Sequence, residues 1–156
     1  MIRTALMVSL AALGLATAAS AAPKFVTTPG AAPAALAASP ISAGAIVPAG
    51  SEIFFVSGIP GAAAAGNTEA QTKDSLTKLE AVLKANGYAL SDVVNAKVYL
   101  VADPATGKMD FQGMNTAFKT FFGTTTEPNK PSRVTVQIAG LAGSGSLVEI
   151  ELTAAK

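Results

Sequence analysis

The most regular pattern in the chain predicts a helix over residues 68–86, because apolar residues recur there at helical spacing. The apolar positions on its expected buried face are Leu76, Leu79, Val82 and Leu83. Thr68 is followed three residues later by Gln71, which is typical of a capping box at the start of a helix. Gly87 suits the residue just past its end.

Three other segments alternate between apolar and polar residues, which predicts strands. They are residues 93–101, 133–139 and 147–153. Residues 45–47 and 52–57 flank the turn-forming residues 48–51, so we expect a β-hairpin there. A second helix is expected to begin after Asp110, whose carboxylate suits an N-cap. The order ββαβαββ predicts an α+β sandwich, a mixed sheet with two helices on one face.

The N-terminus is predicted to be a signal peptide. Arg3 precedes an uncharged stretch, residues 5–19, that is shorter than the about 20 apolar residues of a membrane span. Residues 19–21 read Ala-Ser-Ala and fit the small-x-small cleavage rule. We expect a cleaved signal at 1–21, a flexible Ala/Pro-rich leader at 22–38 and a folded domain at 39–156. The mature protein is then periplasmic or secreted and free of the membrane, and an uncleaved anchor is the alternative.

The composition excludes several kinds of chemistry. The chain has no Cys, His or Trp, so it can form no thiolate nucleophile, Ser-His-Asp triad or Cys/His zinc site. Its formal net charge is +1, and without Arg3 the basic and acidic residues balance. This balance provides no basic footprint for nucleic acid. Acid–base chemistry is left to carboxylates, Lys, Tyr, backbone groups and water.

The two closing strands carry the candidate site. In the first, the apolar set is Val134, Val136 and Ile138, and the polar set is Arg133, Thr135 and Gln137. We expect the apolar set to pack on the helices and the polar set to share the other face with Glu149 and Glu151. If the two strands pair, Gln137 lies near Glu149. Arg133 is the only arginine after signal removal, and its planar guanidinium suits bidentate binding of a carboxylate. An ordinary solvated face is the alternative.

These strands also carry a family signature. Residues 131–141 read PSRVTVQIAGL and residues 147–151 read LVEIE, which closely resembles the Rid family of reactive-intermediate deaminases, also called YjgF. Further matching segments are residues 55–60, 69–72, 92–94, 114–115 and 121–122. The resemblance covers about residues 39–154. It implies a chorismate-mutase-like fold and a homotrimer whose sheets face an inner barrel, with sites in clefts between subunits.

The resemblance also implies an activity, the hydrolysis of 2-imino acids and their enamine tautomers to 2-keto acids and ammonia, with no metal or organic cofactor. Arg133 would bind the carboxylate of the substrate, and Glu149 would position or activate the attacking water. Thr135, Gly58 and Asn115 match positions that contact the substrate. For Gly58 a strand-ending turn, and for Asn115 a local helix contact, are the structural alternatives.

The sequence departs from the family pattern at three places, of which one is that the Gln usual after Ser57-Gly58 is missing. Ile41 stands where an active-site tyrosine is common, which removes a hydroxyl and an aromatic wall. Residues 103–108 form a longer connector than in short family members. Glu151 is expected to be a structural carboxylate that faces the barrel.

Two other functions stay open. One is a non-catalytic module that binds a small carboxylic acid, and the other is a holdase-like protector of unfolded proteins. An endoribonuclease, an older label for such proteins, is disfavoured by the balanced charge and the absence of His.

Overall fold

The computed structural model describes residues 21–156, so the predicted signal peptide lies almost wholly outside the described part of the chain. The strands are β1 (Lys24–Val26), β2 (Gly44–Ile46), β3 (Ile53–Pro60), β4 (Val93–Val101), β5 (Ser132–Ile138) and β6 (Val148–Ala155). The helices are α1 (Pro33–Ala38), α2 (Thr68–Ala85) and α3 (Phe111–Phe118), with short 3₁₀ turns at Ala63–Ala65 and Leu90–Asp92. Within this range no helix is long and apolar enough to cross a bilayer.

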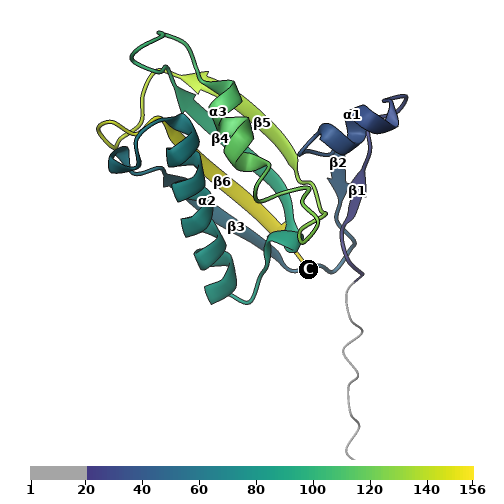
Figure 1. Ribbon diagram of the computed structural model, residues 1–156. Coiled ribbons are helices and arrows are strands. Elements are labelled where there is room, and N and C mark those ends of the chain that lie inside the picture. The colour runs from purple at the N-terminus through teal and green to yellow at the C-terminus, as the bar shows by residue number, and fades with distance from the viewer. Residues whose placement is uncertain (1–20) are drawn as a thin grey trace, which may run out of the picture.

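The main sheet has four strands in the order β3-β6-β4-β5. β4 and β5 are parallel, whereas β6 runs antiparallel to both β3 and β4. Helices α2 and α3 lie on the same face of this sheet (Figure 1). The predicted α+β architecture, a mixed sheet with two helices on one face, is confirmed. The predicted strands at 93–101, 133–139 and 147–153 are present within one or two residues at each end.

The expected pairing of the two closing strands was wrong, because β4 lies between β5 and β6. Two parallel neighbouring strands must be joined by a crossover connection. Helix α3 provides it between β4 and β5, which places β5 at the edge of the sheet. The inner side of β4 is left for β6. Gln137 therefore pairs with Leu100 on β4 and does not lie beside Glu149.

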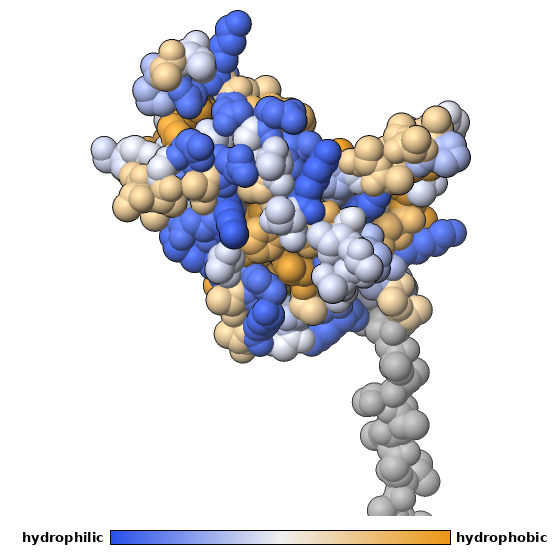
Figure 2. All heavy atoms as spheres, viewed as in Figure 1, coloured by the Kyte–Doolittle hydropathy of each residue, from blue (hydrophilic) through white to orange (hydrophobic). Residues whose placement is uncertain are grey.

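The core lies between the two helices and the sheet. The predicted leucine stripe of α2 is confirmed, because Leu76, Leu79 and Leu83 are fully buried, as is Phe118 of α3. β4 and β6 contribute every second residue to this core. The buried residues of the two strands include Ala96, Val98, Leu100, Val148, Ile150 and Leu152. The outward side of α2 is largely hydrophilic (Figure 2).

The two main helices begin with side-chain caps, of which one was predicted. Asp110 caps α3, because its Oδ1 accepts a hydrogen bond of 2.8 Å from the Gly113 N–H. The predicted cap of α2 was one residue out. Asn67 is the N-cap and accepts from the Ala70 N–H at 3.0 Å, whereas Thr68 is the first helical residue.

Gln71 does not complete a capping box but ties α2 to the loop before β6. Its side chain is buried, and Nε2 donates to the carbonyls of Gly66 at 2.9 Å and Gly145 at 3.1 Å. Its Oε1 accepts from the Leu147 N–H at 2.8 Å. All these partners are backbone groups, so the amide stabilises the loop that leads into β6.

The N-terminal strands form a separate two-stranded sheet, so the predicted hairpin between 45–47 and 52–57 was wrong. The turn itself is present, since the Ser51 N–H donates to the Pro48 carbonyl at 3.3 Å, but β2 pairs with β1 and not with β3. The residues of β1 and α1 fall in the range expected to be a leader. Together with β2 they lie at one side of the main sheet (Figure 1).

Candidate functional site

The polar residues of β5 face the helices. Arg133 lies opposite Ala96 and Thr135 lies opposite Val98, and both β4 residues are fully buried beneath the helices. The valines of β5 are on the other face of the sheet, with exposed fractions of 49% for Val134 and 39% for Val136. The prediction that the valines pack on the helices was therefore wrong. The two faces were separated correctly, but their directions were reversed.

The Arg133 guanidinium is held by one face of α3. Its Cζ lies 4.4 Å from the centroid of the Phe118 ring and 5.7 Å from that of Phe111. Its Nη2 donates a hydrogen bond of 3.0 Å to Oδ1 of Asn115. Residues 111, 115 and 118 follow each other at spacings of four and three, so one helix face presents all three side chains. The aromatic rings stabilise the cation and fix the plane of the fork.

Two buried polar atoms of β5 lack a partner. Neither Nη1 of Arg133 nor Oγ1 of Thr135 makes a hydrogen bond within the described residues. The ion pairs found in residues 21–156 do not include Arg133. Burial lowers the pKa of Arg133 to about 10, so the group is still charged at neutral pH. An unsatisfied buried donor costs about 1–3 kcal/mol, more for a charged group, so an anion bonded to Nη1 would offset this cost. We call Arg133, Thr135 and Asn115 the Arg133 corner.

Glu149 lies on the opposite face of the sheet. It pairs with Tyr99 of β4, and its neighbours in β6, Val148 and Ile150, are fully buried under the helices. Gly58 of β3 packs directly against the Glu149 carboxylate, and a Cβ at position 58 would collide with it. The glycine thus leaves room for the Glu149 side chain. These two predicted site residues are neighbours.

Glu151, on the same face as Glu149, is engaged in a local network. Lys97 Nζ lies 3.0 Å from its Oε2, and the Tyr99 hydroxyl donates to its Oε1 at 3.2 Å. The hydrogen bond to Glu151 raises the pKa of Lys97. No ion pair of the described residues involves Glu149. In the same range no group of three or more carboxylates is arranged to hold a metal ion.

The predicted site residues thus form two separate groups. Arg133, Thr135 and Asn115 lie on the side of the helices. Gly58 and Glu149 lie on the face of the sheet that no helix covers, which we call the open face. The prediction that Arg133, Thr135 and Gln137 share one sheet face with Glu149 and Glu151 was wrong. Because the sheet itself separates the two groups, a small molecule at Arg133 cannot touch Glu149 of the same chain.

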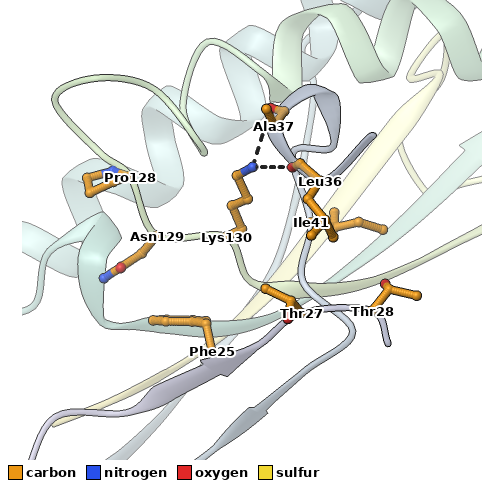
Figure 3. A pocket seen from close by; sticks show the side chains of 9 residues that line it. All are labelled: Phe25, Thr27, Thr28, Leu36, Ala37, Ile41, Pro128, Asn129 and Lys130. Atoms are coloured by element: carbon orange, nitrogen blue, oxygen red, sulfur yellow. Dashed lines mark hydrogen bonds between the residues drawn. The ribbon is translucent and has the colours of Figure 1, made fainter. Parts of the chain in front are cut away.

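Ile41 belongs to neither group. It lines a pocket of about 340 Å³ between the N-terminal elements and the segment before β5, together with Phe25 and Leu36 (Figure 3). Lys130 points across this pocket and donates to the Leu36 carbonyl at 2.7 Å. The Ser42 N–H, next to Ile41, donates to the Pro131 carbonyl at 3.1 Å, so Ile41 is held close to the start of β5.

Comparison with known proteins identifies the family. The model of the family described as endoribonuclease L-PSP matches residues 31–156. A RutC family protein of Pyrococcus horikoshii is 34% identical over 115 residues, which covers 70% of this chain and 83% of the relative. The chain belongs to the Rid (YjgF, L-PSP) family.

Solved structures agree with this assignment. A Rid family protein of Yersinia pestis, YyfB, has a TM-score of 0.67 at 22% identity and covers 86% of this chain and 98% of its own. RidA of an Antarctic Psychrobacter has a TM-score of 0.53 at 28% identity and covers 65% of this chain and 79% of its own. The YjgF-like fold of this Rid protein follows from these likenesses.

Aromatic support of the Rid protein's arginine was not predicted from the sequence. Phe111 and Phe118 were not named as site residues, although their ring centroids lie 5.7 and 4.4 Å from Cζ of Arg133. Their spacing on either side of Asn115 was a usable signal, because it places all three residues on one helix face.

Proposed function

We propose that this Rid family protein hydrolyses 2-imino acids and their enamine tautomers to 2-keto acids and ammonia. One observation carries the proposal: the buried Nη1 of the charged Arg133 has no hydrogen-bond partner in the described residues, and it lies two residues along the strand from the buried, unpartnered Thr135 hydroxyl. Two residues on one strand face are about 7 Å apart. That separation fits a small molecule with a carboxylate at one end and a polar group beyond it.

The carboxylate of the substrate is the natural partner of Arg133. A guanidinium fork binds a carboxylate through two parallel hydrogen bonds, and such charge-assisted bonds are short and directional. Asn115 and the Phe118 ring already fix the guanidinium, so little side-chain freedom is lost on binding. Held in this way, the C2 atom of the imino acid has one orientation relative to the attacking water.

The chemical step needs one base and one water. The imine carbon is electrophilic, so water adds to C2 while Glu149 accepts a proton from that water. Glu149 returns this proton to the imine nitrogen, which gives a carbinolamine with one hydroxyl and one amino group on C2. The hydroxyl proton then passes through Glu149 to the same nitrogen, the C–N bond breaks as the C2–O bond becomes a carbonyl, and the nitrogen leaves as NH3. One water is consumed for each imino acid. The packing of Gly58 against the carboxylate supports this role, since it fixes Glu149 without an ion pair.

The site requires a second copy of the chain. Arg133 and Glu149 lie on opposite faces of one sheet, so the proposal pairs Arg133 of one subunit with Glu149 of its neighbour. The open face offers an apolar surface for such an assembly, since Phe55 is 77% exposed and Val134 and Val136 are also exposed. Repeated around one axis, this head-to-tail contact forms a closed ring. We propose that the ring is the homotrimer that the family resemblance implies.

The direct test is ammonia release from imino acids generated in situ by an amino-acid oxidase. We expect the wild-type protein to accelerate release well above hydrolysis in solvent. If the protein binds the 2-keto acid product in calorimetry but gives no acceleration, it is a carboxylate-binding module. If it does neither, the interpretation of the Arg133 corner is wrong.

A further inference from the structure

Two large apolar side chains lie near the Arg133 corner, of which Phe111 also supports the guanidinium and Met109 has no role in the reaction described so far. Met109 and Phe111 are 37% and 41% exposed, and they lie just before and at the start of α3. The Phe111 ring is one of the two that lie against the guanidinium. Exposed apolar side chains at the edge of a polar site are typical of a ligand contact.

The segment that carries Met109 is an ordered turn. The Asp103 N–H donates to the Lys108 carbonyl at 2.9 Å, and Oδ1 of Asp103 accepts from the Ala105 N–H at 2.7 Å. The Met109 N–H then donates to Oε1 of Gln137 at 3.0 Å. This last bond joins the connector to β5, so Met109 has a fixed place relative to the strand.

Gln137 lies on the same face of β5 as Arg133 and Thr135. Alternate residues of a strand are about 7 Å apart, so Gln137 is roughly 13 Å from Arg133 along the strand. Met109 is bound at the Gln137 end, and Phe111 contacts the Arg133 end. Phe111 therefore lies beside a carboxylate held at Arg133, and Gln137 fixes the backbone of Met109 two residues before Phe111.

We propose that Met109 and Phe111 form a side-chain subsite that selects 2-imino acids with bulky apolar side chains over small ones. The inference rests on the proposed deaminase function and adds the substrate class to it. Gln137 is a positioning residue, because it holds the backbone of Met109 and acts on the substrate through it.

The test compares kcat/KM for imino acids generated in situ from leucine, phenylalanine and alanine. The wild type prefers the leucine and phenylalanine products. Met109→Ala and Phe111→Ala each lower the ratio of large to small substrate by about tenfold, the usual effect of removing apolar contacts in a pocket. Gln137→Ala raises KM for the large substrates more than it changes kcat. Ile46→Ala, an exposed aliphatic truncation on β2, keeps the wild-type ratio.

The outcomes separate the two proposals. Equal kcat/KM values for all three substrates, or ratios unchanged in both alanine variants, overturn the subsite while the deaminase function stands. If the wild type releases no ammonia from any substrate, the deaminase function fails, and the subsite is measured by calorimetry with pyruvate and 4-methyl-2-oxopentanoate. Tighter binding of the larger acid that is lost in Met109→Ala supports the subsite. Equal affinities overturn it.

Discussion

The two faces of the central sheet differ in the groups that surround their candidate site residues. On the helical face, α3 supplies Asn115 and two aromatic rings around Arg133, and Nη1 of Arg133 has no hydrogen-bond partner within the described residues. On the open face, Gly58 packs against Glu149, and Val134 and Val136 of the edge strand are exposed. In the proposed function, one chain therefore holds two halves of a site that face away from each other. The comparison teaches that the assembly, and not the single chain, is the catalytic unit proposed for this protein.

The largest expected effect lies on the open face. Glu149→Gln keeps the shape of the side chain but removes the base, so kcat should fall by roughly 10²–10⁴, the range for general acid–base catalysis. Steady-state ammonia release measures this. Glu151→Gln is the matched control on the same strand and face, and it should retain kcat because Glu151 serves Lys97 and Tyr99. Equal losses in both variants would contradict the separate roles of the two carboxylates.

The next effect lies on the helical face. Arg133→Lys keeps the charge but loses the planar fork and its contact with the Phe118 ring. Loss of such a desolvated charged hydrogen bond costs about 2–5 kcal/mol, and most of it should appear as weaker substrate capture. Measured kcat/KM should therefore fall mainly through KM. A variant with wild-type kcat/KM would show that Arg133 does not bind the substrate.

Local features of the fold could be predicted from the sequence, whereas the placement of Arg133 and Glu149 could not. Helix α2, strand β4 and the Asp110 cap follow from local patterns, because the leucine spacing, the alternation and the carboxylate before a helix act within a few residues. Alternation on β5 separates Arg133 from the valines, but it cannot say which set the helices cover. Apolar valines usually face a core, and here they face outward on an edge strand. The order of strands, set by the crossover through α3, is equally non-local.

A substitution on the open face is expected to weaken assembly clearly and to change the stability of the single chain little. Val134→Glu places a charge on a surface that the proposed trimer buries. A buried unpaired charge costs about 3 kcal/mol, which is roughly 100-fold in an association constant. Light scattering should show a shift towards monomer with little change in thermal unfolding, since Val134 is 49% exposed in the single chain. Ile46→Glu on β2 is the control that keeps the assembly, and an unchanged trimer in Val134→Glu would argue against this interface.

The smallest effect is expected at Ile41. This residue lines the pocket with Leu36 and Lys130, and it stands where the family resemblance implies a tyrosine. Ile41→Tyr restores a hydroxyl and an aromatic wall, so deaminase activity should be unchanged or rise a few-fold, and kcat/KM of the variant measures it. A large loss would show that the isoleucine has been adapted to a different ligand.

The most direct test of a site shared between subunits is to mix the two impaired variants and to assay them at substrate concentrations well below KM. Arg133→Lys chains retain Glu149, and Glu149→Gln chains retain Arg133, so a mixed ring contains some interfaces with both native residues. With equal amounts and random mixing in a closed ring, about a quarter of the sites are native. Co-refolded variants should therefore recover about a quarter of the wild-type deaminase activity. Activity no higher than the sum of the two separate variants would contradict the shared site.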